Sequence, residues 1–435
     1  MTTRASVELW DTPIAEVAWD PIRRFADFRY LEAFLGNPIE PSPIRMPKRR
    51  GLYRFDRLPE EAFQGLPGLL ADALPDRYGH AVINRWLEAQ GRPANSMNPV
   101  EKLLYIGRRA MGALSFAPPN QALGSDDNPI EIDDLVALAN AVLDSRRNAR
   151  RVISNRENYE NLISVGVSAG GARAKALVAF NESRTELRSG QIDVPPGFSH
   201  WLLKLDGVQG SGDHGIPDPQ GYGRIEYAYS LMARAAGIDL PETALLEDGP
   251  RRHFMVRRFD RPGGRERLHM QTLGALVHVD YNEPGLFSYE QTLGVIRRLK
   301  CPAADQAEFL RRAFFNVLAR NHDDHVKQVA FLMDKQGRWR LSPAYDLTYA
   351  FNPAGRWTAR HQMALAGKRD DFTTQDLLRL GDAAEQGPAR TLDILGEVSA
   401  AVGCWPDFAA TAGIGADIVT KIASAHRRGL FREHA

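Results

Sequence analysis

The order of strand-like and helix-like patterns along this chain is the strongest constraint on its fold. Before Asp260, short apolar runs typical of β-strands (ALVAF, HWLLKLD and HFMVRRF) alternate with turns, and one amphipathic helix is predicted at residues 224–236. After Asp260 the sequence is mostly helical, apart from a predicted hairpin at residues 334–339. This order predicts an α+β protein with a β-rich lobe at residues 135–260 and a helical lobe at residues 261–435.

A separate α/β domain is predicted to precede the two lobes, at residues 1–116. Residues 7–10, 15–18 and 51–55 are predicted to be short strands, and apolar residues then recur with helical spacing. Asp76 follows a helix-breaking proline and is predicted to be the N-cap of the next helix.

The next stretch, residues 117–134, has the proline-rich and acidic composition of a linker. A helix is predicted near residues 132–145. It is followed by a basic cluster whose spacing would gather the arginines on one helical face, although such faces are usually only solvated. The cluster consists of Arg146, Arg147, Arg150 and Arg151.

Composition excludes several classes of protein. A chain of 435 residues with 43% hydrophobic and 25% charged residues is typical of a globular protein, and its net charge of +1 indicates no polyanionic partner for the whole chain. Its two cysteines cannot form a disulfide framework or a multi-cysteine zinc site. Without a signal-peptide pattern or a run approaching ~18 apolar residues, we expect a cytoplasmic protein with no membrane partner.

The segment NHDDHVKQVAFLM, residues 321–333, is the most informative for chemistry. Phosphoryl transfer needs a carboxylate that orients the attacking hydroxyl and accepts its proton, and it needs ligands for magnesium. Asp323 is the candidate carboxylate, and Gln328 stands five residues later, where protein kinases have a metal-binding asparagine. Taken alone, the segment is also compatible with a metal-hydrolase site or a solvated polar loop.

A second carboxylate, Asp346, lies between apolar neighbours in RLSPAYDLTYAF, after the predicted hairpin. The phosphotransferase template has its second magnesium-binding aspartate in this place. The alternative is that Asp346 only caps a turn after Pro343.

The segment VGVSAGGARAKALVAF, residues 165–180, is rich in glycine and could bring backbone N–H groups close to phosphate oxygens. It matches neither the P-loop nor the usual kinase pattern, and a plain glycine-rich β-turn is the commoner structure.

Lys204 is the only cation in a strand-like run, and a lysine there usually needs a partner. In a kinase the partners are the phosphates and a helical glutamate, for which Glu226 is the candidate. The alternative for Lys204 is an edge-strand lysine that reaches water.

These elements occur together in the order found in kinases, and the chain resembles the HipA family, the kinase toxins of bacterial toxin–antitoxin modules. The resemblance covers nearly the whole sequence. VELWDTPIAEVAWD, RRGLYRF, GLPGLLADALPDRYG and NPVEKLLYIGRRAMGAL are similar to the family's N-terminal domain. VSAGGARAKA, HWLLKLD, MVRRFDR, ARNHDDHVKQVAFL and WRLSPAYDLTYAFNP are similar to its two-lobed, protein-kinase-like core.

The resemblance implies roles for individual residues. Asp323 matches the catalytic aspartate, Asp346 and Gln328 match the magnesium ligands, and Ser168 matches the serine that these kinases autophosphorylate. The implied ATP-binding residues are Gly170, Gly171, Ala172, Arg173, Ala174, Lys175, Lys204, Arg257, Arg258, Phe259, His325, Lys327, Gln328 and Tyr345.

The family also implies partners. Its members use ATP and Mg²⁺ to phosphorylate a serine of an aminoacyl-tRNA synthetase, which arrests growth. A helix-turn-helix antitoxin of the HipB type binds the toxin, and only through that complex does the toxin reach operator DNA. The chain departs from the family at Gln328, where the family has asparagine, so a degenerate kinase that serves mainly as co-repressor is the alternative. A small-molecule kinase shares the same order of parts and also stays open.

Overall fold

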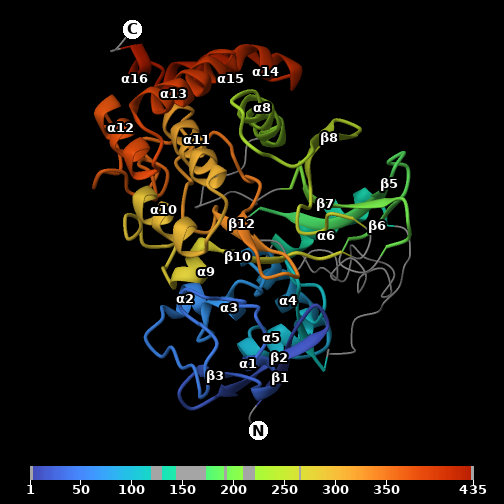
Figure 1. Ribbon diagram of the computed structural model, residues 1–435. Coiled ribbons are helices and arrows are strands. Elements are labelled where there is room, and N and C mark those ends of the chain that lie inside the picture. The colour runs from blue at the N-terminus through green and yellow to red at the C-terminus, as the bar shows by residue number, and fades with distance from the viewer. Residues whose placement is uncertain are drawn as a thin grey trace. The chain divides into compact units, whose positions relative to one another are not determined.

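The computed structural model describes residues 3–118, 130–143, 173–190, 194–208, 221–263 and 266–432 (Figure 1). The chain forms two compact units. Unit 1 comprises residues 1–42, 46–220 and 244–270, and unit 2 comprises residues 43–45, 221–243 and 271–435. Unit 1 thus contains most of the predicted α/β domain and most of the predicted β-rich lobe, and the predicted domain boundaries stay a prediction.

The first sheet of unit 1 is antiparallel and has the strand order β3-β2-β1-β4. Its strands are β1 (Arg4–Leu9), β2 (Thr12–Asp20), β3 (Phe25–Tyr30) and β4 (Leu114–Ala117). The strands predicted at residues 7–10 and 15–18 are confirmed within β1 and β2. The strand predicted at residues 51–55 is wrong, because that stretch forms only an isolated bridge from Tyr53 to Phe28.

Five helices of unit 1 lie between β3 and β4. The Asp76 N-cap is confirmed, since its Oδ1 accepts a hydrogen bond of 2.7 Å from the Gly79 N–H at the start of α4. The helices are α1 (Glu32–Leu35), α2 (Glu60–Phe63), α3 (Gly68–Ala71), α4 (Arg77–Ala89) and α5 (Pro99–Ile106).

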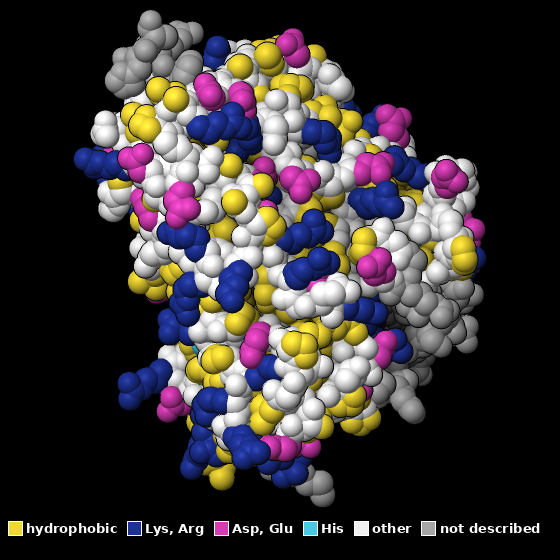
Figure 2. Space-filling view, viewed as in Figure 1, with side chains coloured by type: hydrophobic (Ala, Val, Ile, Leu, Met, Phe, Trp, Pro, Cys, Tyr) yellow, Lys and Arg dark blue, Asp and Glu magenta, His cyan; other side chains and the backbone are white. Residues whose placement is uncertain are grey.

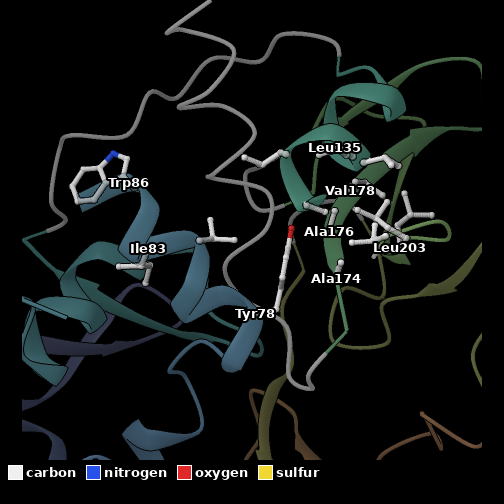
Figure 3. Close-up of a cluster of buried hydrophobic side chains, with 14 of the residues drawn as sticks. Tyr78, Ile83, Trp86, Leu135, Ala174, Ala176, Val178 and Leu203 are labelled. Carbon is white, nitrogen blue, oxygen red and sulfur yellow. The ribbon is translucent and has the colours of Figure 1, made fainter. Parts of the chain in front are cut away.

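The second sheet of unit 1 has the strand order β6-β5-β7-β9-β8. Its strands are β5 (Lys175–Asn181), β6 (Leu187–Ser189), β7 (Phe198–Lys204), β8 (Thr243–Asp248) and β9 (Arg251–Arg257). The predicted helix after the linker is present as α6 (Ile132–Leu143). Side chains of α4, α6, β5 and β7 share one buried hydrophobic cluster, so the sheet is tied to elements from the first part of the chain (Figure 3).

Unit 2 is mostly helical, as predicted for the C-terminal part. The predicted helix at residues 224–236 is present as α8 (Tyr222–Ala235), and α10, α11, α12 and α13 pack on one another (Figure 1). The remaining helices after β10 (His269–Thr272) are α9 (Leu273–Val277), α10 (Tyr289–Arg298), α11 (Ala304–Leu318), α12 (Thr374–Ala383), α13 (Pro388–Gly403), α14 (Trp405–Thr411), α15 (Ala416–Ala425) and α16 (Gly429–Arg432).

The predicted hairpin of unit 2 is confirmed. β11 (Ala330–Met333) pairs antiparallel with β12 (Trp339–Leu341), and β10 completes a sheet of the order β10-β11-β12. This hairpin separates the two acidic segments and returns the chain toward the first of them.

The surface carries charges of both signs. On the face drawn in Figure 2, Lys and Arg side chains are interspersed with Asp and Glu. Within the described residues, every helix is too short or too polar to cross a membrane.

Candidate active site

The acidic loop, which we define as residues 321–328, follows α11 and leads into β11. From His322 to Lys327 its side chains alternate between buried and half-buried positions. The buried positions are His322, Asp324 and Val326, and the half-buried positions between them are Asp323 and His325. The fold therefore separates the two adjacent carboxylates and leaves that of Asp323 on the accessible side.

A turn closes the end of the acidic loop. The backbone N–H of Gln328 donates to the carbonyl oxygen of His325 at 2.8 Å, and the N–H of Lys327 donates to His325 Nδ1 at 3.2 Å. His325 Nε2 lies 3.7 Å from Asp323 Oδ1, and Lys327 Nζ lies 4.7 Å from the centre of the Tyr281 ring. The turn thus places the His325 imidazole near the half-buried Asp323 carboxylate.

The aspartate segment, which we define as residues 343–350, runs beside the acidic loop and is fastened to it at both ends. At one end Tyr345 Oη donates to the carbonyl oxygen of Lys327 at 2.6 Å. At the other end Asn321 bridges to Ala350, whose carbonyl oxygen accepts from the N–H of His322 at 3.1 Å. Asp323 and Asp346 both lie between these two attachments along the chain, so the hairpin brings the two acidic segments together.

The backbone of Asp346 is unusual. Its φ of +53° lies in the left-handed region, which residues other than glycine rarely adopt. Such conformations persist where the surrounding structure imposes them and are frequent at functional sites. The near neighbours Ala344 and Leu347 are buried, and the choice between a magnesium ligand and a turn cap for Asp346 stays a prediction.

Magnesium fits the donor chemistry of these segments. Carboxylate and amide oxygens, the hard donors that Mg²⁺ prefers, are offered by Asp346 and Gln328. The described residues contain no group of three or more His, Cys, Asp or Glu side chains that could hold a metal ion by themselves. A site with few protein ligands is nevertheless usual for Mg²⁺, which is commonly bound by one or two carboxylates, water and substrate phosphates.

Lys204 lies at the end of β7, in the middle of the five-stranded sheet of unit 1, between β5 and β9. The edge-strand alternative for this lysine is therefore wrong. Its half-buried ammonium is 5.8 Å from the centre of the Phe254 ring on β9. Glu226, its predicted partner, is buried on α8 in unit 2, and the pairing of the two stays a prediction.

Two predicted ATP-binding cations have carboxylate partners inside unit 1. Lys175 is buried, and its Nζ lies 3.1 Å from Asp76 Oδ2. Arg258 is also buried and donates two hydrogen bonds to the Asp260 carboxylate, at 2.9 and 2.7 Å. Both side chains thus have a carboxylate partner in this structure, and their roles in ATP binding stay predictions.

The other predicted ATP-binding residues of unit 1 that the structure describes differ in their burial. Arg257 is exposed and Phe259 is half-buried at the end of β9, while Ala174 is buried and Arg173 is half-buried at the start of β5. Ser168, Gly170, Gly171, Ala172 and the basic cluster at residues 146–151 lie outside the described residues. The roles of all these residues stay predictions.

The sequence reasoning missed the residues that hold the acidic loop from the buried side. The sequence pattern gives Asp324 no role of its own, yet this residue is buried and hydrogen-bonded to His361 and Tyr289. The only local signal was the alternation of burial that an extended HDDHV stretch would produce.

Comparisons with known proteins agree with this architecture. A model of the HipA-like C-terminal domain matches residues 167–405, and a model of the HipA N-terminal domain matches residues 5–117. "Putative kinase Y4dM" of Sinorhizobium fredii is 25% identical over 309 residues, which are 67% of this chain and 65% of that protein. "Putative kinase Y4mE" of the same organism is 25% identical over 364 residues, which are 80% of this chain and 77% of that protein.

A third relative, from Haemophilus influenzae and named "Putative kinase", is 27% identical over 159 residues, 33% of this chain and 46% of that protein. The matched regions thus span less than two thirds of the length of this relative and of Y4dM.

Among solved structures, the HipA toxin of Shewanella oneidensis MR-1, determined in complex with HipB and operator DNA, has a similar fold. The TM-score is 0.67 at 16% sequence identity, and the likeness covers 98% of this chain and 96% of that one. The predicted α+β fold with a HipA-like, two-lobed kinase-like core is thereby confirmed.

Proposed function

This chain belongs to the HipA family, and we propose that it is an ATP-dependent serine/threonine protein kinase. One observation carries the proposal. The acidic loop and the aspartate segment are fastened together on both sides of Asp323 and Asp346, by the Tyr345–Lys327 hydrogen bond and the Asn321–Ala350 bridge. Two carboxylates held in neighbouring segments match the two acidic roles that phosphoryl transfer requires.

In this proposal Asp323 orients the acceptor hydroxyl and takes its proton, and His325 beside it completes the accessible side of the loop. Asp346 and Gln328 would hold magnesium, which neutralises phosphate charge when it is bound. Lys204, in the middle of its sheet, would contact the ATP phosphates. Arg173, Lys327 and Tyr345 would line the rest of the nucleotide site, and Arg257 and Phe259 would contribute beside the adenine.

The proposed biological role is that of a toxin in a cytoplasmic toxin–antitoxin module. The substrate would be a serine of an aminoacyl-tRNA synthetase, so that phosphorylation stops tRNA charging and growth. Ser168 would be the autophosphorylation site. The proposed partner is a helix-turn-helix antitoxin of the HipB type, through which the chain would reach operator DNA. The solved HipA complex with HipB and operator DNA supports this part of the proposal.

Intact-mass spectrometry of the purified chain after incubation with ATP and Mg²⁺ tests the kinase proposal. A gain of one phosphate, mapped by phosphopeptide analysis to Ser168, is the expected result. The same mapping on a cell extract treated with the chain should give a phosphoserine in a tRNA synthetase. If neither the chain nor any extract protein gains phosphate, the proposal is wrong.

The second candidate is a degenerate kinase that acts mainly as co-repressor, and Gln328 is the observation that favours it. A chain that gains no phosphate but binds the antitoxin tightly in the presence of operator DNA would indicate this second function.

Replacing Gln328 with asparagine is expected to raise ATP turnover. A glutamine places its amide oxygen roughly 1.5 Å further along the side chain than asparagine does, and magnesium requires near-octahedral ligands at about 2.0–2.1 Å. Since a displacement of about 1 Å can cost on the order of 10²-fold in rate, the gain should reach up to that size. Turnover is compared with that of Gln336→Asn, the same change at an exposed position of the hairpin. Unchanged or lower turnover of Gln328→Asn refutes this prediction.

A further inference from the structure

We propose that Asp324 and His361 are positioning residues, which anchor the acidic loop from its buried side and so direct the Asp323 carboxylate toward the reaction. The inference rests on the proposed kinase function of that loop and adds two residues to it. Neither of them is expected to touch ATP or the acceptor.

The Asp324 carboxylate is held at three points. It is buried and accepts hydrogen bonds from His361 Nδ1 at 2.8 Å, Tyr289 Oη at 2.5 Å and the backbone N–H of Gln362 at 2.6 Å. The donors come from α10 and from the chain beyond the aspartate segment. Three fixed donors leave a two-oxygen side chain little freedom to rotate.

The same network reaches the first residue of the acidic loop. Asn316 on α11 donates from Nδ2 to Tyr289 Oη at 3.1 Å and accepts from Asn321 Nδ2 at 2.9 Å. Asn321 and Asp324 are thus tied to one buried set of polar groups, on either side of Asp323. A buried hydrogen-bond network of this kind restricts the arrangement of the residues that it connects.

The charges in the network are consistent with an ionised Asp324. Burial alone raises the pKa of its carboxyl, but the charge and hydrogen bond of His361 and the hydrogen bonds from Tyr289 and the Gln362 backbone hold that pKa below the ordinary value of 3.8. Because an ionised carboxylate only accepts hydrogen bonds, His361 Nδ1 and Tyr289 Oη are the donors.

The ring of His322 lies 4.0 Å from that of His361. Burial, followed by the charge of His361, lowers the pKa of His322 to about 3, so His322 adds no charge at neutral pH.

Anchoring Asp324 has a direct consequence for its neighbour. Because adjacent residues share a peptide unit, fixing one side chain on the buried side restricts the direction of the preceding side chain. The buried Asp324 and the half-buried Asp323 have this relation. If the anchor is lost, Asp323 can shift, and a displacement of about 1 Å is enough to cost on the order of 10²-fold in rate.

The test compares four single-substitution variants of the 435-residue chain. Asp324→Asn keeps the shape and removes the charge, and His361→Leu removes the donor. His361→Asn restores an amide N–H close to the position of Nδ1. Val398→Ala, in α13, is the control, because it removes buried volume from unit 2 without changing the acidic loop or its polar network. The measurements are kcat and KM for ATP, thermal unfolding, and amide hydrogen exchange of residues 319–330.

We expect Asp324→Asn and His361→Leu to lower kcat by about 10- to 10²-fold while the KM for ATP changes little, and His361→Asn to recover part of the loss. Hydrogen exchange of residues 319–330 should accelerate in the two impaired variants but not in Val398→Ala. If kcat and loop exchange change no more than in the control, the positioning role is refuted. Should the unaltered chain transfer no phosphate at all, the kinase proposal fails instead, and the exchange data still decide whether these residues anchor the loop.

Discussion

Replacing Asp323 with asparagine is expected to reduce phosphate transfer by about 10²–10⁴-fold, the usual contribution of a general base. Asparagine fills the same space, but it cannot accept the proton of the acceptor hydroxyl. The half-buried carboxylate of Asp323 is the accessible member of the Asp323–Asp324 pair, so its loss should reduce transfer more than Asp324→Asn does. The measurement is transfer of labelled phosphate from ATP to the chain itself and to an extract.

The matched control for this substitution is Asp371→Asn. The side chain of Asp371 is 99% exposed, and its left-handed φ of +52° is a conformation that asparagine also tolerates. This variant should keep full activity. If Asp323→Asn transfers phosphate as fast as the control, Asp323 is not the catalytic carboxylate. Growth arrest by the Asp323→Asn variant would contradict the prediction in the same way.

The acidic loop could be predicted from the sequence because its chemistry is contiguous. Two carboxylates, two histidines and a lysine within seven residues, followed by a strand and a hairpin, indicate both the site and its second segment. The hairpin then had to return the chain toward the loop, and the Tyr345–Lys327 hydrogen bond is the result.

The support of the loop could not be predicted in this way. The two side-chain partners of Asp324 lie 35 and 37 residues away, at Tyr289 and His361, and no local pattern relates them to it. Lys175 is a similar case, because its partner Asp76 is 99 residues distant and looked like a helix cap alone. For Lys204, the choice between an edge and a central strand depended on the order of strands in the sheet, which local periodicity does not contain.

The wrong strand prediction lies beside β3, the edge strand of the first sheet. Residues 51–55 have the alternation of a strand, but only Tyr53 pairs, with Phe28 on β3. A short apolar run becomes a strand only if a neighbouring edge offers it several backbone partners, and that depends on tertiary structure rather than on propensity.

The second large effect is expected from Asp260, which is fully buried in unit 1. Its carboxylate accepts two hydrogen bonds from Arg258, one of 2.7 Å from Arg261 and one of 2.8 Å from the Gly112 N–H. It thereby connects β9 and the chain after it to the segment before β4. Asp260→Ala leaves two arginines buried without their carboxylate, which should lower the free energy of unfolding by about 3–5 kcal/mol. Urea unfolding of the chain measures this loss.

Two further variants separate the charge effect from simple loss of contacts. Glu16→Ala removes an exposed ion pair with Arg29 on the neighbouring strand of the same unit, with both side chains more than half exposed, and should cost about 0–1 kcal/mol. The double variant Arg258→Met with Asp260→Leu removes both partners of the closest pair, and it should destabilise less than Asp260→Ala alone. Equal losses for Asp260→Ala and Glu16→Ala would show that burial of the arginines is not the cause.

The pH dependence of the same variant gives an independent check. Burial alone raises the pKa of the Asp260 carboxyl, but the charges of Arg258 and Arg261 and their hydrogen bonds bring it well below the ordinary value of 3.8. A carboxyl whose pKa is lowered by folding contributes stability that is complete above its unfolded pKa and is lost as the pH falls toward the folded value. The difference in unfolding free energy between the unaltered chain and Asp260→Ala should therefore be constant above about pH 5 and shrink below it. A difference that grew on acidification would mean that the buried carboxyl is protonated in the folded protein, and the ion-pair account of this junction would be wrong.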